Sequence, residues 1–583
     1  MDPVAFTLLR NSLELITDEM TLTMVRTAYS GNIRDAMDFS AAICSGSGDM
    51  IAQGPCLAVH LGSIPAAMAA VRERFAGEMA SGDVYMINDP YCGGMHLPDI
   101  FLFKPLYGDS GLLAFLVIVA DHVDVGGHSA GSRSVLSQEI FAEGLRIPPV
   151  RLQQRGEDCT DVWNILRQNT RLPQMVLGDI RSCLAAFHSA EQMFRETVAE
   201  HGEAATVQFF SDALAYSEQF LRQWIRSIPN GSYRFTDWLD DGVATPEPVR
   251  IEVGLEVRDD SLHFDFTGSS PQVKASINAT RSFTESSVYA AVRTLLPNQV
   301  PNNAGLFRPI RVHTPAGSVV HASEPAAVAQ RGVTGSRVID AVLGVLAKVA
   351  PERVPAASEG GISSVRITGR TADGRSFVVW DSIAGTWGGR PDRDGIDGCS
   401  SFAMNVANVS AEMIEAEYPV MIHRYALRAD SGGAGRYRGG LGICREWELL
   451  DGEATFVMRS DRARSAPWGL AGGGQGARSR SVFDPEGEAR LLPSKFELPI
   501  KRGDRILHEQ AAGGGHGDPF SRDPQRVLRD WENGKITDAH ARDAYGVVIR
   551  EAAIDAAATR ARRAAGRMPP REPDPDVIAT ISR

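Results

Sequence analysis

The longest apolar run of the chain covers residues 111–120 and reads GLLAFLVIVA. It is too short to cross a bilayer as a helix, which takes about 20 residues. Such a run instead predicts a strand that is buried on both faces. Asp121 and His122 follow it directly, so titratable side chains come immediately after the most apolar segment. The sequence therefore predicts a candidate site at the end of a central strand.

Size, charge and cysteine usage restrict the class of protein. A chain of 583 residues ordinarily divides into about two to four domains. Its net charge of −12 argues against a nucleic-acid-binding surface. The N-terminal residues mix acids with apolar side chains and lack a basic leader, and the 7 cysteines form no C-x-x-C pair. These features favour a cytoplasmic protein without a membrane segment, in a reducing compartment.

Hydrophobic periodicity predicts both helices and strands. A first helix is expected to start at Asp2-Pro3 and to end near Gly31, and a hairpin is expected over residues 39–52. Further strands are predicted at Val84–Ile87, Ile100–Leu106, Leu112–Ala120, Val249–Val257 and Ser261–Phe266. Further helices are predicted at Ile64–Met79, Asp161–Gln168, Ala204–Ile228, Thr284–Leu296, Thr334–Val349, Val409–Ala416 and Ile549–Gly566.

This mixture predicts an α+β, multi-domain fold with mixed and antiparallel sheets and surrounding helices. The pattern changes character near residues 235–245. We therefore expect an N-terminal metal-site region over residues 1–240. A C-terminal α+β region with Gly-rich loops is expected over residues 241–548, and a helical, partly disordered tail over residues 549–583.

The densest functional signal lies between residues 88 and 132. His96 and Asp99 are three residues apart, so one cation could touch both from a turn, and His122 follows the buried strand. Two imidazoles and one carboxylate bind a divalent transition metal and leave positions open for water or substrate. A histidine beside an aspartate is also common as a plain hydrogen-bonded pair. His128 is either a further ligand or a loop residue.

Two other segments are candidates for chemistry. Asp38, in Asp-Phe-Ser, could face a cleft as a general base, or it could be an ordinary turn or capping residue. The segment 430–440, with its glycines and two arginines, could hold an anion, although a tight hairpin explains it as well. The chain contains no G-x-x-x-x-G-K-[ST] motif, so a Walker-type loop does not bind ATP here.

Several motifs, taken in order, resemble the hydantoinase B / oxoprolinase family. That family includes subunits of N-methylhydantoinase, caprolactamase, and the acetone and acetophenone carboxylases. The resemblance runs from about Val4 to Val548. The motifs that carry it are Arg34–Ser40, Asn88–Asp99, Asp121–Gly127, Glu143–Pro149, Asp265–Ser269, Pro301–Gly305, Asp430–Gly442, Gly513–Pro519 and Tyr545–Val548.

The resemblance implies an ATP-dependent hydrolase of cyclic amides that works as a hetero-oligomer. A hydantoinase A-type partner subunit would bind ATP and Mg and activate the carbonyl of a small-molecule substrate. This chain would complete the hydrolysis at a zinc or manganese ion held by His96, Asp99 and His122. Asp38 would activate water.

The chain departs from the family pattern at two places near the expected cleft. Asp35-Ala36-Met37 stands where the family usually has a Glu-Arg pair before the aspartate, and Ala130 replaces a proline after the Gly-Gly loop. These departures put the exact substrate in question. ATP-dependent carboxylation of a ketone is the alternative activity, and a non-catalytic scaffold for the ATPase subunit is a third possibility.

Overall fold

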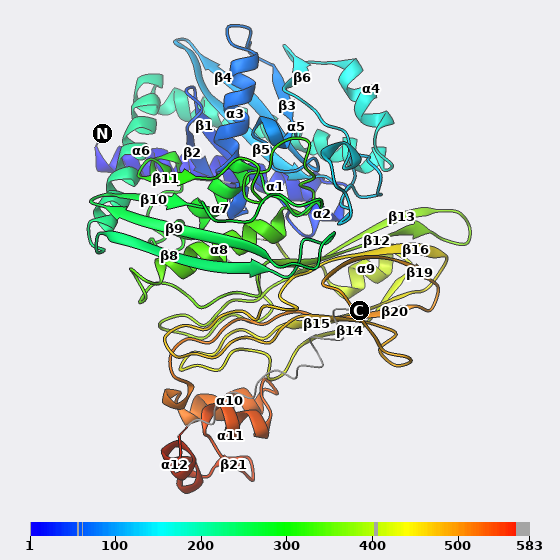
Figure 1. Ribbon diagram of the computed structural model, residues 1–583. Coiled ribbons are helices and arrows are strands. Elements are labelled where there is room, and N and C mark those ends of the chain that lie inside the picture. Colours follow the sequence, from blue (N-terminus) through cyan, green and yellow to red (C-terminus); the bar gives the residue numbers. More distant parts are fainter. Residues whose placement is uncertain (1, 55–56, 61, 402–405, 567–583) are drawn as a thin grey trace. The chain divides into compact units, whose positions relative to one another are not determined.

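The computed structural model describes residues 2–54, 57–60, 62–401 and 406–566 (Figure 1). The chain forms two compact units. Unit 1 consists of Met1–Thr236, Ile251–Ile339 and Phe402–Ala407, and unit 2 consists of Asp237–Arg250, Asp340–Ser401 and Asn408–Arg583. Each unit is thus assembled from segments that are not contiguous in the chain. No helix among the described residues is long and apolar enough to cross a membrane.

Unit 1 is built on a seven-stranded sheet in the order β2-β1-β5-β4-β3-β6-β7. Its interior strand β5, between β1 and β4, contains the long apolar run, and residues 113–121 are buried, as the sequence predicts. All neighbouring strands in this sheet are antiparallel. The strands are β1 (Phe39–Ser45), β2 (Met50–Gln53), β3 (Val84–Ile87), β4 (Asp99–Gly108), β5 (Gly111–Asp121), β6 (Val150–Gln154) and β7 (Glu157–Asp158).

Two long helices pack against each other and against this sheet. In α1 (Pro3–Thr27), the Asp2 side chain accepts hydrogen bonds from the first backbone N–H groups, and one apolar face is buried. α5 (Pro173–His201) packs along α1 and against β4 and β5. The other helices of unit 1 are α2 (Gly31–Arg34), α3 (Ser63–Arg74), α4 (Thr160–Gln168), α6 (Glu203–Ile225) and α7 (Arg281–Arg293), and α8 (Gly332–Leu346) continues from unit 1 into unit 2.

A second, four-stranded sheet has the order β11-β10-β9-β8. Its antiparallel pair β9–β10 is the hairpin that the sequence predicts, and β10 pairs with β11 in parallel. Unit 1 therefore combines helices with antiparallel and mixed sheets, which confirms the predicted α+β class. These strands are β8 (Gly231–Leu239), β9 (Val249–Arg258), β10 (Ser261–Asp265) and β11 (Ile310–His313).

Unit 2 contains a four-stranded sheet, β13-β12-β16-β19, and a five-stranded sheet, β14-β15-β20-β17-β18. Apolar side chains of both sheets, including Trp447 and Phe456, form one buried core. The strands are β12 (Ile362–Arg370), β13 (Ser376–Ala384), β14 (Val420–Leu427), β15 (Ile443–Leu449), β16 (Glu453–Arg459), β17 (Arg480–Phe483), β18 (Arg490–Leu492), β19 (Lys495–Lys501) and β20 (Arg505–Glu509). The helix α9 (Ala411–Glu417) packs on β14.

The Gly-rich segments of unit 2 run beside one another with very close backbone contacts. A Cβ atom on Gly513 would lie 2.1 Å from the carbonyl oxygen of Trp387, and one on Gly514 would lie 2.1 Å from that of Trp468. Arg438, a candidate anion ligand, is buried and pairs with Asp397 at 2.9 Å. These glycines therefore allow backbone layers to touch.

The last part of unit 2 corrects one prediction. Residues 549–566 were expected to form a single helix, but β21 (Ile549–Arg550) and β22 (Ala553–Ile554) form a hairpin, and α12 (Ala556–Ala564) begins only afterwards. Glu551 and Ala552 adopt left-handed φ values of 49° and 57° in the turn, which a helix does not allow. The helices α10 (Pro524–Glu532) and α11 (Asp538–Tyr545) precede this hairpin. The tail beyond residue 566 lies outside the described residues.

His508 links the two sheets of unit 2. Its Nδ1 lies 2.9 Å from the Ser481 hydroxyl on β17, and its Nε2 lies 3.1 Å from the Ser363 hydroxyl on β12. Burial, together with the charge of Arg428, lowers the pKa of His508 to about 3. The native state therefore holds His508 neutral at a pH where the unfolded chain would protonate it.

Acidification is therefore expected to destabilise the chain through His508. Between the unfolded pKa near 6.5 and the folded pKa of about 3, this histidine lowers the free energy of unfolding as pH falls. The largest slope is about 1.4 kcal/mol per pH unit. Urea unfolding at pH 7 and pH 5 should show a smaller loss for His508→Gln than for wild type. The exposed His188→Gln should behave like wild type, and an unchanged loss in His508→Gln would refute the assignment.

Candidate metal centre

β1, β5 and β4 are neighbours in the seven-stranded sheet, and one end of each lies at the same side of it. β4 begins at Asp99 and β5 ends at Asp121, and the antiparallel register pairs these two residues directly. On the other side of β5, β1 pairs Phe39 with Ala120, which places Asp38 beside the same strand end. The N–H group of Asp121 donates to the carbonyl of Asp38 at 3.0 Å. The strand register alone thus brings three aspartates together.

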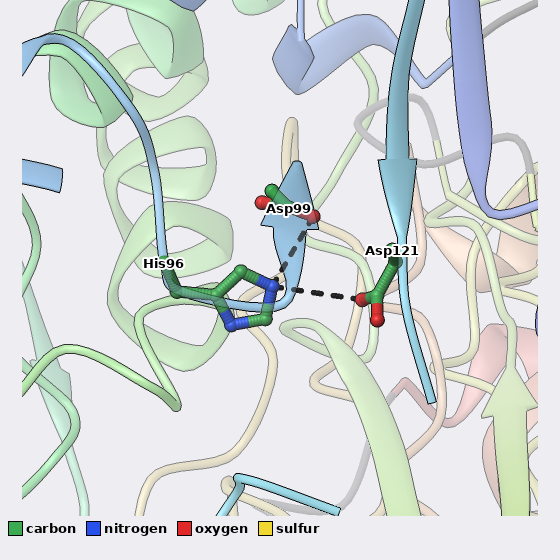
Figure 2. A group of neighbouring side chains, drawn as sticks. All are labelled: His96, Asp99 and Asp121. Atoms are coloured by element: carbon green, nitrogen blue, oxygen red, sulfur yellow. Dashed lines mark ion pairs between the residues drawn. The ribbon is translucent and has the colours of Figure 1, made fainter. Parts of the chain in front are cut away.

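His96 reaches the same place from the turn before β4. Gly93 has a φ of +100°, and a Cβ atom there would lie 2.5 Å from the backbone of Ala66, so this turn requires glycine. The Nε2 atom of His96 lies 3.2 Å from Oδ1 of Asp99 and 3.5 Å from Oδ2 of Asp121 (Figure 2). All three side chains are buried, and one potential ligand atom from each lies within 4.8 Å of the others.

The protonation of His96 decides what this cluster can hold. Its Nδ1 lies 3.0 Å from the carbonyl oxygen of Ala329, and a carbonyl only accepts, so Nδ1 carries the proton. Burial, helped by Arg331 and opposed by Asp99, lowers the pKa of His96 to about 3. The imidazole is therefore neutral near pH 7, and its Nε2 presents a lone pair.

Lone pairs thus face one another across the cluster. Burial would raise the pKa of Asp99, but the charge of Arg331 outweighs it and holds that pKa well below its usual range. Among the described residues, Nε2 of His96 and the Oδ1 atoms of Asp99 and Asp121 have no hydrogen-bond partner. Buried acceptors without a donor are costly, so this donor set fits a bound cation.

Two arginines from distant parts of the chain orient the two carboxylates. The guanidinium of Arg331 pairs with Oδ2 of Asp99, and that of Arg133 pairs with Oδ2 of Asp121. Both arginines are buried, and Arg331 also lies over the ring of Phe283 at 4.6 Å. Each carboxylate is held through one oxygen, and its Oδ1 atom stays available to a ligand.

His122 lies beside the cluster. The backbone N–H group of His122 donates to the carbonyl of Pro98 at 2.9 Å, and the residue is 1% exposed. Burial lowers the pKa of His122, against the effects of Asp179 and Asp99. Its Nδ1 has no hydrogen-bond partner among the described residues, but Asp121 supplies the third of the close ligand atoms. A ligand role for His122 stays a prediction.

Asp38 also lies where a functional role is feasible. It is 7% exposed, and its negative charge acts on Arg331, the partner of Asp99. The residue before it, Met37, has a left-handed φ of 57°, a conformation that non-glycine residues adopt rarely and often at functional sites. The base role of Asp38 stays a prediction. The expected loop residue His128 is exposed, and its N–H group bonds the carbonyl of Ala142.

The sequence analysis assigned no role to four residues of this neighbourhood. They are His60, Asp121, Arg133 and Arg331. His60 is buried, and its Nδ1 lies 2.7 Å from the Ser40 hydroxyl. Burial lowers the pKa of His60 to about 4, an effect that Asp99 opposes and Arg331 reinforces. The serine of Asp-Phe-Ser was a signal for His60, and the position before His122 was a signal for Asp121. No local pattern points to Arg331.

Comparison with known proteins identifies relatives along nearly the whole chain. The family described as hydantoinase B/oxoprolinase matches residues 2–519. The B-type subunit of a putative D-/L-hydantoinase of Pseudomonas sp. is 33% identical over 94% of this chain and 96% of its own length. The beta subunit of the caprolactamase of Pseudomonas jessenii is 33% identical over 97% of this chain and 99% of its own length.

Two solved structures share the fold. The crystal structure of ATP-dependent caprolactamase from Pseudomonas jessenii matches with a TM-score of 0.89 and 31% identity, covering 97% of this chain and 100% of that chain. Nucleotide-free acetone carboxylase matches with a TM-score of 0.89, covering 97% of this chain and 84% of that chain. At 20% identity, the second match shows a common fold only.

Proposed function

Because this chain belongs to the hydantoinase B/oxoprolinase family, we propose that it is one subunit of an ATP-dependent hydrolase that opens cyclic amides. The observation that carries this proposal is the buried cluster of His96, Asp99 and Asp121, in which lone pairs face one another. The relatives are named as a hydantoinase and a caprolactamase, and each is named as one subunit of its enzyme.

Four side chains are the proposed metal ligands. His96, Asp99 and Asp121 supply one nitrogen and two carboxylate oxygens, and His122 is the predicted further ligand from the adjoining position. Imidazole and carboxylate donors favour zinc or manganese over calcium. A divalent ion bound there supplies Lewis acidity toward a carbonyl oxygen and lowers the pKa of water.

The remaining residues have distinct parts in the proposed reaction. Water adds to the carbonyl carbon of the ring amide, and Asp38 accepts the proton that this water loses. The C–N bond then breaks, and the ring nitrogen takes this proton from Asp38 and leaves as the amine. Arg331 and Arg133 hold Asp99 and Asp121 in place, so the ligands need little rearrangement.

ATP is proposed to act through a partner. The chain has no Walker-type phosphate loop, and its relatives are named as one subunit of a larger enzyme. A hydantoinase A-type partner would bind ATP and Mg and phosphorylate the carbonyl oxygen. The phosphorylated amide has lost its resonance stabilisation, so water attacks it readily. Once the C–N bond has broken, the carboxyl carbon still carries the phosphate, and a second water hydrolyses this acyl phosphate to the carboxylate and inorganic phosphate.

We expect ATP-dependent ring opening only when this chain is co-purified with such a partner. Hydantoin, 5-oxoproline and caprolactam would be offered in turn, and the open amino acid would be measured by mass spectrometry with and without ATP. Turnover by the partner complex and none by either protein alone would support the proposal.

Two results would contradict it. Robust ATP-coupled turnover by this chain alone would remove the need for a partner. A product that gains one carbon from bicarbonate would instead indicate a ketone carboxylase. A complex containing His96→Ala is the matched control, since it should assemble and bind ATP but leave the ring closed.

A further inference from the structure

Glu143 is a buried carboxylate that the reaction proposed above does not use. It follows the short 3-10 helix of residues 140–142 and is 1% exposed. Its two oxygens accept from the N–H group of Val328 at 2.9 Å and 3.1 Å, and Oε1 also accepts from Ala329 at 2.8 Å. Both oxygens are thus directed at the backbone of one segment.

That segment, residues 326–331, touches the candidate metal centre twice. The carbonyl of Ala329 accepts the Nδ1 proton of His96 at 3.0 Å, which fixes the tautomer with a lone pair on Nε2. Two residues later, the guanidinium of Arg331 pairs with Asp99. Glu143 therefore bonds the N–H group of the same residue whose carbonyl orients His96.

Backbone hydrogen bonds hold this segment on both sides of Val328 and Ala329, and after them the N–H of Gln330 donates to the carbonyl of Ser276 at 2.8 Å. The N–H of Ile140 donates to the carbonyl of Pro325 at 2.8 Å, and the N–H of Ala327 donates to Gln138 at 3.3 Å. At Val328 and Ala329, the acceptor is the Glu143 side chain. Without that carboxylate, two buried N–H groups would lack an acceptor, and the segment would have to shift to satisfy them.

We propose that Glu143 is a positioning residue for the metal centre, which acts through Ala329 on His96 and through Arg331 on Asp99. The inference rests on the proposed metal site. Glu143 contacts no candidate ligand itself, so its effect depends on reach and hydrogen-bond geometry rather than on its charge. Outer partners of metal ligands typically change metal affinity by about 10–100-fold.

Two substitutions separate the reach of the Glu143 side chain from the presence of a carboxyl group. Glu143→Gln keeps the length and one acceptor oxygen, which can still take both N–H groups. Glu143→Asp keeps the carboxyl group but is one methylene shorter, so its oxygens fall short of the segment. We therefore expect near-normal metal affinity for Glu143→Gln and about 10–100-fold weaker affinity for Glu143→Asp.

The test uses the full-length chain and titrates zinc and manganese against a chromophoric chelator. Asp240→Ala is the matched control, because Asp240 is another buried carboxylate that accepts N–H groups, here from residues 463–465 of unit 2. It should lower stability and leave metal affinity unchanged. Hydrogen exchange of the metal-free chain gives a second readout, since the amides of Val328 and Ala329 should exchange faster in Glu143→Asp than in Glu143→Gln.

The outcomes distinguish this inference from the proposed function. A wild-type chain that binds neither metal would overturn the metal site and this inference with it. A wild-type chain that binds metal, with Glu143→Asp binding equally well, would overturn the inference alone. Weak binding by Glu143→Gln with normal binding by Glu143→Asp would also overturn it, because the carboxyl group, and not the reach of the side chain, would then be the deciding property.

Discussion

Replacing His96 with alanine is expected to weaken metal binding by at least about 100-fold and to abolish ring opening. Removing a ligand should exceed the 10–100-fold cost of losing a partner one shell further out. The His96 lone pair faces both carboxylates, so the substitution removes the nitrogen ligand of the close cluster. Asp99→Ala should have an effect of the same size.

The same measurement ranks the third and fourth ligands. Elemental analysis of Asp121→Ala and His122→Ala would show which of these side chains the metal needs, since only Asp121 belongs to the close cluster. His128→Ala, in an exposed loop, is the control and should retain full metal. Full metal retention in both His96→Ala and Asp99→Ala would end the assignment.

Asp38→Asn is expected to slow turnover by about 10²–10⁴-fold while metal content stays normal. The amide keeps the shape of the side chain but cannot accept the proton of attacking water at neutral pH. The bond from Asp121 to the Asp38 carbonyl involves only backbone, so it survives the substitution. Product formation and metal content would be measured together in the assembled complex.

The control for this variant is Asp35→Asn, which removes a carboxylate paired with Arg34 in the same loop. Asp35→Asn should lose less turnover than Asp38→Asn. Normal turnover of Asp38→Asn with metal in place would exclude Asp38 as the base. Loss of metal from Asp38→Asn would instead make Asp38 a ligand.

Local sequence patterns correctly predicted the strands that carry Asp99 and Asp121. The sequence predicts strands at residues 100–106 and 112–120, and the structure pairs them as an antiparallel hairpin. Its register pairs Asp99 with Asp121 only because it shifts by one residue between Leu106 and Tyr107, and no local pattern predicts that shift. Ligand chemistry instead favoured His122, because two histidines and an aspartate form a familiar ligand set.

Other features depend on contacts between distant residues. Arg331 and Ala329 lie more than 200 residues from the ligands that they orient, and no spacing rule connects them. The helix α5 was missed although its apolar residues, such as Val176, Ile180 and Phe187, recur at helical spacing. The predicted helix at 549–566 was wrong at its start because alanine-rich composition outweighed a two-residue turn.

The length of the β4–β5 hairpin fixes how far its turn lies from Asp99 and Asp121. Its tip at Asp109-Ser110 lies about 30 Å from the paired aspartates, because each residue adds about 3.3 Å to a strand. At this tip, the carboxylate of Glu203 accepts hydrogen bonds from the N–H group and the hydroxyl of Ser110. One residue gained or lost along either strand would turn Asp99 or Asp121 to the opposite face. The number of residues between Asp99 and Asp121 therefore constrains these strands as strictly as the packing of their apolar side chains does.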